Sequence, residues 1–277
     1  MRKAYPLGLM CELYQVSRSG YYAWCDRGPS RRSIDDEALS VQIRAIHMGS
    51  KRSYGSLRIK AELAAQGHPV GRRRIMKLML RDGLRGRRRR RRIFTTETME
   101  GQAVVPNRLL GQPKPVRTNQ LWVTDITYIP TNQGTLYMAA VLDAFSRRLI
   151  GWSFGPQMGA NLCTQALRMA VRQRRPLPGL VHHSDQGMQY LSNQYRQALA
   201  DIGAVSSMSR KGNCYDNAII ESFWSTMKLD CLEGKQFHSR QQATVALFEY
   251  VISFYNRTRR HSSLGYLSPV AFEKLNN

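Results

Sequence analysis

Hydrophobic positions in the first part of the chain recur three or four residues apart, the spacing of helices that bury one face. The spacing predicts a pair of short helices over residues 7–24, with Ser17 or Ser19 as the N-cap of the second helix. A second pair is predicted over 56–66 and 72–81, joined by a turn that contains glycine and proline. Both pairs have the outline of a helix-turn-helix.

From residue 121 onward the pattern is that of strands. Leu121–Ile129 is rich in β-branched and aromatic residues on both faces, as in a central strand covered on both sides. Two more apolar strands, over 136–143 and 149–154, are predicted to complete an antiparallel meander. The remaining predicted elements are a helix over 161–174, a strand over 179–183, a helix over 193–202, a strand over 204–208 and a helix beginning near Asn217. This order predicts an α/β fold, a five-stranded mixed sheet with helices on both faces.

Between these regions, Thr95–Thr118 contains three prolines and two glycines and little apolar periodicity, as linkers do. The predicted organisation is an N-terminal helix-turn-helix-like segment, a basic helix-turn-helix domain that ends in an arginine run, a linker and a catalytic core. Their predicted bounds are 1–34, 35–94, 95–112 and 113–277.

The net charge of the chain is +23, and it lies mostly in the first half. Residues 1–120 hold 26 Lys and Arg against 9 Asp and Glu, a net of +17, which leaves +6 for residues 121–277. The segment from Arg85 to Arg92 contains seven arginines interrupted by Gly86, and such a block stays solvated because the charges repel. It is either a basic tether or a contact for a polyanion, which repays the clustering by releasing counterions. No amphipathic apolar face accompanies the block, so nucleic acid is favoured over a membrane surface.

Further cations support DNA binding. Three arginines occupy the first turn of the helix predicted at 72–81, where they oppose the helix dipole unless they reach an anion. The alternative is a helical bundle with a basic, solvated face. The predicted DNA contacts are Arg72, Arg73, Arg74, Arg87, Arg88, Arg89, Arg90, Arg91, Arg92, Lys228, Arg257, Arg259 and Arg260.

Cysteine and histidine do not indicate a disulfide framework or a zinc site. The five cysteines are widely spaced, without a C-x-x-C pair. His182 and His183 are adjacent, so on a strand they point to opposite faces. With no apolar run long enough for a membrane span, the sequence predicts a soluble, cytoplasmic protein.

Three carboxylates are candidates for catalysis. Asp125 lies inside an apolar strand, where a lone charge is costly without a partner or a metal. Asp185 follows the strand predicted at 179–183, and Glu221 lies on the polar face of the last predicted helix. Each alone could be a salt-bridged, capping or solvated residue. Together they predict a site for Mg²⁺, with Mn²⁺ as a substitute, and two such ions about 3.5–4 Å apart support phosphodiester chemistry.

Four segments resemble the OrfB-type transposases of the IS-three (IS3) family of bacterial insertion sequences, which belong with retroviral integrases to the DDE superfamily. They are Trp122–Tyr128, His182–Asp185, Ser207–Ala218 and Phe254–Tyr266. Tyr54-Gly55-Ser56 with Val70–Arg74 is similar to the family's helix-turn-helix, and the resemblance extends over nearly the whole chain. One departure is that Gln186 and Met188 stand where the family usually has Arg and Ser.

The resemblance implies a ribonuclease H-like integrase core with Asp125, Asp185 and Glu221 as ligands of two Mg²⁺ ions. It implies a DNA transposase that cleaves the 3′ ends of its element and joins them to target DNA. The implied partners are double-stranded DNA at the terminal repeats and target, further copies of the chain on DNA, and an upstream-frame (OrfA) protein or fusion. Two alternatives remain open: a nuclease on the same fold without strand transfer, and a DNA-binding regulator that does not cut.

Overall fold

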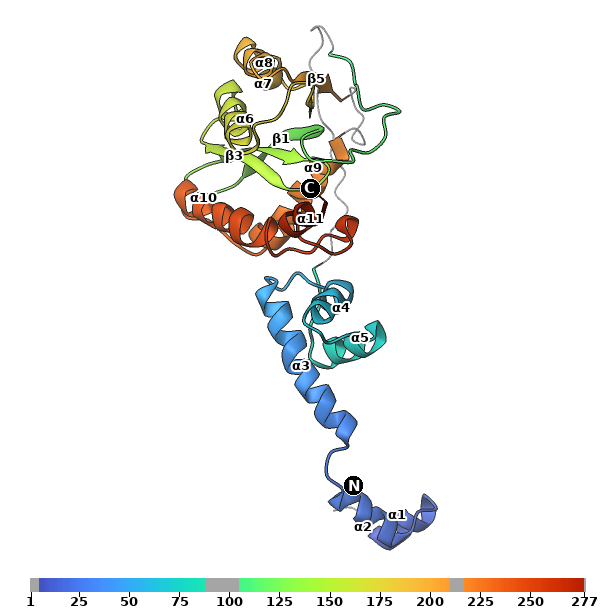
Figure 1. Ribbon diagram of the computed structural model, residues 1–277. Coiled ribbons are helices and arrows are strands. Elements are labelled where there is room, and N and C mark those ends of the chain that lie inside the picture. The colour runs from blue at the N-terminus through green and yellow to red at the C-terminus, as the bar shows by residue number, and fades with distance from the viewer. Residues whose placement is uncertain (1–4, 88–104, 210–216, 277) are drawn as a thin grey trace.

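The computed structural model describes residues 5–87, 105–209 and 217–276, which form three units placed one after another along the molecule (Figure 1). The N-terminal unit is a pair of short helices, α1 (Leu7–Leu13) and α2 (Arg18–Asp26). Of the two serines considered, Ser17 is the N-cap of α2, because its hydroxyl accepts from the Gly20 amide at 3.0 Å.

The second unit contains three helices, α3 (Arg31–Gly49), α4 (Ser56–Ala65) and α5 (Arg72–Arg81). The sequence predicted α4 and α5, and α3 was missed. Apolar side chains from all three helices meet in its interior, and the most deeply buried are Ile43, Ile59, Leu63, Ile75 and Leu78. Gly86 interrupts the arginine run because a Cβ there would lie 2.7 Å from the backbone of Gly55.

The third unit is built on a five-stranded sheet of order β3-β2-β1-β4-β5. β1, β2 and β3 form the predicted antiparallel meander, and β4 and β5 run parallel to β1. Their bounds are β1 Leu121–Ile129, β2 Leu136–Asp143, β3 Leu149–Gly155, β4 Val181–Ser184 and β5 Val205–Met208.

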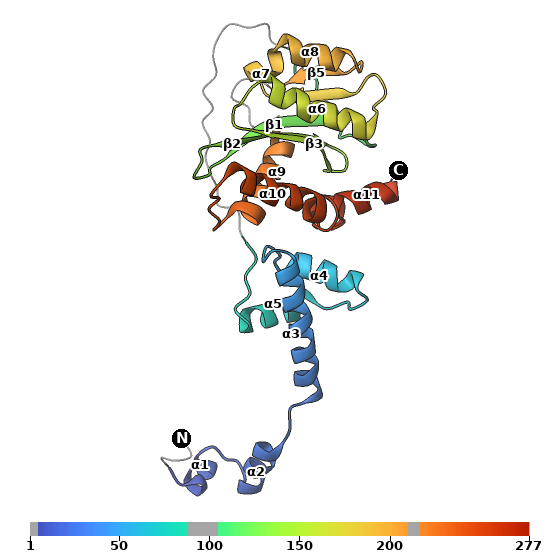
Figure 2. The ribbon, with the colours of Figure 1, turned by 90° about the vertical axis from the view of Figure 1, so that its left-hand side faces the viewer.

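Helices cover both faces of this sheet, as predicted (Figure 2). One face carries α6 (Ala160–Arg174), α7 (Met188–Leu191) and α8 (Asn193–Ala200). The other carries α9 (Ala218–Met227), the π-helical η2 (Lys228–Leu232), α10 (Arg240–Glu249), η3 (Tyr250–Tyr255) and, past the 3₁₀ turn η4 (Ser262–Leu264), α11 (Pro269–Asn276). The sequence did not predict the helices after α9. Among the described residues, no helix is long and apolar enough to cross a bilayer.

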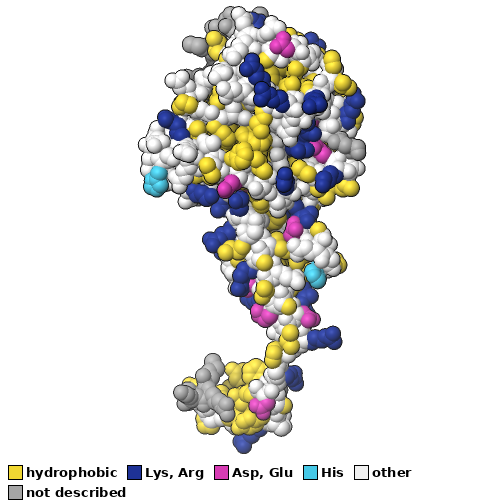
Figure 3. Space-filling view, turned by 60° about the vertical axis from the view of Figure 1, so that its left-hand side comes forward, with side chains coloured by type: hydrophobic (Ala, Val, Ile, Leu, Met, Phe, Trp, Pro, Cys, Tyr) yellow, Lys and Arg dark blue, Asp and Glu magenta, His cyan; other side chains and the backbone are white. Residues whose placement is uncertain are grey.

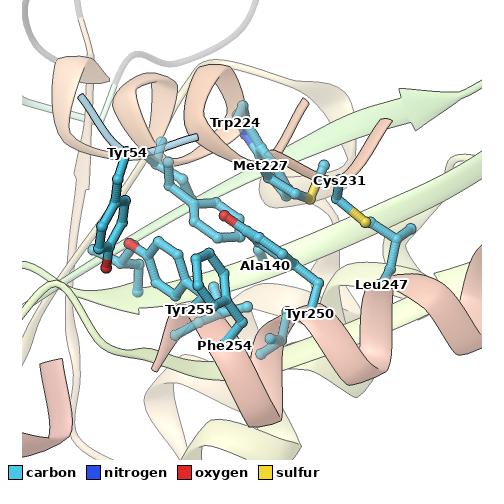
Figure 4. Packing of buried hydrophobic residues seen from close by; sticks show 14 of the residues in the cluster. Tyr54, Ala140, Trp224, Met227, Cys231, Leu247, Tyr250, Phe254 and Tyr255 are labelled. Atoms are coloured by element: carbon cyan, nitrogen blue, oxygen red, sulfur yellow. The ribbon is translucent and has the colours of Figure 1, made fainter. Parts of the chain in front are cut away.

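The three-helix unit packs on the face of the third unit that is formed by the helices after α9. Tyr54 lies beside Phe254, and their ring centroids are 6.5 Å apart (Figure 4). The Tyr54 hydroxyl accepts from the Arg260 amide at 2.7 Å, and Arg58 donates to the Arg260 carbonyl at 3.0 Å. The Arg260 guanidinium also pairs with Glu62 on α4. Side chains of both units therefore share one hydrophobic cluster.

Candidate active site

Asp125 occupies the middle of β1, opposite Ala140 of β2. One carboxylate oxygen accepts from the Ile126 amide at 2.8 Å and the other from the indole N–H of Trp224 at 2.9 Å. Burial raises the pKa of Asp125 to about 7, the negative charges of Asp185 and Glu221 add to the rise, and the two hydrogen bonds oppose it. Asp125 thus lies within the field of both other candidate carboxylates.

Asp185 is the first residue after β4, the strand that pairs with β1 in parallel at Val123 and His183. Its carboxylate accepts from the Gly187 amide at 3.0 Å, which fixes the turn into α7. Burial raises its pKa. The parallel pairing of two neighbouring strands is what places Asp185 near Asp125, since equivalent ends of parallel strands lie on one edge of a sheet.

Glu221 lies in the first turn of α9. The opposite side of that helix is apolar, and Ile220, Phe223, Trp224 and Met227 are all buried against the sheet. Glu221 remains exposed, although partial burial raises its pKa. Trp224 is one helical turn beyond Glu221, so its bond to Asp125 ties the helix that carries one carboxylate to the strand that carries another.

These carboxylates suit a hard divalent cation by chemistry. All three donor groups are oxygen, and a cation would offset both the burial and the repulsion that raise the pKa of Asp125. Their spacing is looser than that of a formed metal centre: in the described part of the chain, no group of three or more acidic, His or Cys side chains is gathered closely enough to hold an ion. Ligation by all three would require side-chain movement toward Asp125.

The predicted DNA contacts of the helical unit have different environments. Arg73 is exposed, Arg74 pairs with Asp36 at 2.6 Å, and Arg72 donates to the Ser56 hydroxyl at 3.4 Å. Arg87 donates to the Leu229 carbonyl. Arg88 to Arg92 lie outside the described residues.

In the third unit, Arg257 is exposed and lines a groove of about 730 Å³ with Arg168 and Arg172. Lys228 lies over the Tyr128 ring, with its Nζ 4.9 Å from the centroid. Arg259 is only 4% exposed and pairs with Asp230 at 2.5 Å. The prediction of a DNA contact is therefore withdrawn for Arg259.

The same correction applies to Arg260, whose guanidinium is held by Glu62 and the Tyr266 carbonyl. Both side chains stabilise the packing of elements instead of facing solvent. Sequence reasoning also missed Trp224 as a hydrogen-bond donor to Asp125. Its place on the apolar stripe of α9 gave only the expectation of packing, because an indole can both pack and donate.

Family models match most of the chain. A model described as "HTH-like domain" matches residues 33–92, and two described as "Integrase core domain" match 115–214 and 203–269.

Curated relatives match over nearly their whole lengths. The chain is 43% identical to the "Insertion element IS600 uncharacterized 31 kDa protein" of Shigella sonnei, over 96% of this chain and 97% of that one. It is 40% identical to the "Transposase for insertion sequence element IS904" of Lactococcus lactis, over 91% and 99%. It is 38% identical to the "Transposase InsF for insertion sequence IS3A" of Escherichia coli, over 98% and 95%.

Two solved structures are similar at a lower level. One is a simian T-cell lymphotropic virus intasome in complex with a PP2A regulatory subunit, at 12% identity and a TM-score of 0.46, covering 77% of this chain and 70% of that one. The other is the HTLV-2 integrase catalytic core in complex with magnesium, at 14% identity and a TM-score of 0.41, covering 57% and 98%.

Proposed function

Because the chain belongs to the IS3-family transposases and carries their integrase core, we propose that it cuts and joins DNA with Asp125, Asp185 and Glu221 as its catalytic carboxylates. The integrase core and the transposase family predicted from the sequence are confirmed by the family models and the relatives. The individual residues are our assignment.

One observation carries that assignment: Asp125 is half-buried in the central strand within the negative field of Asp185 and Glu221, and its pKa is raised to about 7. A lone structural carboxylate would be paired with a cation of the protein, as Asp230 is with Arg259. Asp125 has two neutral donors and two acidic neighbours instead, an arrangement that favours an external cation.

Members of the integrase core family depend on a divalent metal. We assign the metal here as Mg²⁺, two ions with Mn²⁺ as a substitute, held by Asp125, Asp185 and Glu221. When bound, it would polarise the phosphate and lower the pKa of the attacking hydroxyl.

The protein's own groups position this chemistry. β1 and the Ile126 amide fix one oxygen of Asp125, and the Trp224 indole fixes the other. Gly187 orients Asp185, and the N-terminal turn of α9 places Glu221 where the helix dipole favours a negative charge. Lys228, one turn beyond Trp224, is the proposed phosphate contact near the cut, and its Nζ lies over the ring of Tyr128, three residues along β1 from Asp125.

The proposed DNA surface combines the exposed cations of α5, the arginine run and Arg257. Double-stranded DNA of the element's ends and of the target would bind there through phosphate contacts. We assign its place of action to DNA in the bacterial cytoplasm, with several copies on one DNA complex and an upstream-frame protein or fusion as a further component.

The test uses labelled DNA that carries the element's own ends, incubated with the protein and Mg²⁺. We expect cleaved and joined products, and their loss by at least about 10³-fold in Asp125→Asn, since removal of a metal-ligating carboxylate abolishes charge stabilisation. Cleavage without joining would indicate the nuclease alternative, and binding without cleavage would indicate the regulator. Undiminished joining by Asp125→Asn would refute the site assignment. Arg196→Gln, an exposed change on α8, is the matched control.

A further inference from the structure

Helix α3 has two apolar faces, and only one of them is buried by the rest of the chain. Leu39, Ile43 and His47 point into the three-helix unit and are at most 7% exposed. On the other side, Ile34, Val41 and Met48 are 57%, 65% and 53% exposed.

These exposed positions follow a heptad pattern. Ile34, Ala38, Val41, Ala45 and Met48 are separated by four, three, four and three residues, and all five are exposed. This is the spacing of the seam along which two α-helices pack as a coiled coil. We call these five residues the α3 seam.

Charge distinguishes this part of the molecule from the rest. Residues 5–49 contain five Arg and Lys (Arg18, Arg27, Arg31, Arg32, Arg44) and five Asp and Glu (Glu12, Asp26, Asp35, Asp36, Glu37), a net charge of zero in a chain of +23. A surface without net positive charge is a poor ligand for DNA phosphates. Two copies of it can approach each other, because neither sign is in excess.

The N-terminal helix pair extends the same apolar character. Leu13, Tyr14 and Trp24 are 76%, 68% and 68% exposed, and in the described part of this pair only Cys11 is buried. Figure 3 shows hydrophobic side chains gathered on this unit and others along the narrow segment that joins it to the body. A pair of helices this small does not form a sufficient core by itself.

We propose that residues 5–49 are a dimerisation arm whose α3 seam packs against the α3 seam of a second copy of this chain. Two heptads are short for an isolated coiled coil, which needs about three or four. The exposed aromatic and aliphatic side chains of α1 and α2 supply the additional apolar area. Such a dimer would relate two HTH-like domains by one two-fold axis, independently of the catalytic site.

The first test is sedimentation velocity of the full chain without DNA, over a range of protein concentrations. We expect a reversible dimer. The combined variant Ile34→Ser, Val41→Ser and Met48→Ser should have a dissociation constant at least about 100-fold higher, because three apolar side chains lose their burial. The matched control replaces three equally exposed side chains elsewhere: Met76→Ser, Leu80→Ser and Val245→Ser, at 48%, 76% and 52% exposure.

At a protein concentration where the parent chain is monomeric, circular dichroism and the melting temperature should be unchanged in both combined variants, since every position replaced is exposed in the monomer. A second measurement uses Val41→Cys, with Cys25 and Cys214 changed to Ser. Oxidation should give a disulfide-linked dimer, whereas Val245→Cys in the same background should not. A monomer at all concentrations, or a dimer that the seam variant leaves intact, would overturn the proposal. Asp125→Asn should dimerise like the parent chain, so this result is separate from the catalytic assignment.

Discussion

Asp125 places a carboxyl group inside an apolar strand, where burial makes ionisation of the group cost free energy. Two hydrogen bonds offset part of the cost of the charge. The same position makes the carboxylate a strong ligand for a cation, because few other groups compete for its charge. The ionised carboxylate of Asp125 thus destabilises the metal-free protein, and we expect a bound metal ion to stabilise the folded state through the same group.

This opposition predicts a pH dependence of stability. The pKa of Asp125 is about 7 in the folded state and close to 3.8 in the unfolded state, so between these values only the folded state holds the proton. Stability therefore falls as the pH rises from about 4 to 7. In metal-free buffer at about pH 8, Asp125→Asn should increase the free energy of unfolding by about 1–2 kcal/mol, a figure reduced for the partial exposure of the group.

Urea denaturation in a chelating buffer, at about pH 4 and about pH 8, measures this effect. The two proteins should differ little at the lower pH. Addition of Mg²⁺ at the higher pH should raise the stability of the parent chain and leave Asp125→Asn unchanged. A destabilised Asn variant at the higher pH would show that Asp125 is held as a structural anion.

At the scale of elements, the helices after α9 are joined by a buried polar cluster. Asp230 of η2 accepts from the Tyr250 hydroxyl at 3.0 Å and from Arg259 at 2.5 Å. This cluster holds η2, η3 and the segment that follows them together, on the face of the sheet that also carries α9. Arg257, two residues before Arg259, points to solvent. Neighbouring arginines therefore belong to different parts of the molecule.

Substitution of Arg259 should affect stability, whereas substitution of Arg257 should affect DNA binding. Arg259→Ala leaves the Asp230 carboxylate buried without its cation, and we expect it to lower the free energy of unfolding by about 3–5 kcal/mol. Arg257→Ala should change stability by less than about 0.5 kcal/mol, weaken DNA binding and reduce its salt slope by about 0.9. Denaturation curves and DNA titrations at several salt concentrations measure both. Equal stability losses would mean that Arg257 also supports the fold.

At the scale of the whole molecule, charge is divided by position. Residues 50–120 contain 19 Lys and Arg against 4 Asp and Glu, whereas residues 5–49 are neutral. Most of the excess charge, +15 of +23, thus lies in residues 50–120, which span much of the HTH-like domain and the segment that leads into the core. The contacts of Tyr54, Arg58 and Glu62 with the Arg260 region couple this basic unit to the catalytic unit.

This division predicts where DNA affinity resides. Replacement of Arg88 to Arg92 by Gln should reduce the salt slope of DNA binding by about 0.9 for each phosphate that the run neutralises. Arg87 is kept, because it donates to the Leu229 carbonyl. The control replaces Arg27, Arg31 and Arg32 of the neutral arm and should leave the slope unchanged. An unaltered slope in the five-residue variant would identify the run as a tether.

The sequence alone predicted the strand meander, the helices α6, α8 and α9 that cover the sheet, and three carboxylates from this region, but it missed the short helix α7. Strong periodicity made this possible: β1 is apolar on both faces, and α9 has one apolar side. Helix α3 was missed because it has apolar residues on both sides, Leu39 and Ile43 on one and Val41 and Ala45 on the other, which weakens the helical period.

Composition and spacing thus determined which elements form and which chemistry the chain carries, because propensity and burial pattern act over short stretches of sequence. Only the tertiary structure decided which arginines face solvent, which donor holds Asp125, and which face of α3 remains uncovered. Each of these depends on contacts between residues far apart in the chain, such as Arg260 with Glu62 or Trp224 with Asp125. The identity of an arginine fixes its charge, and its packing partners decide whether that charge can meet DNA.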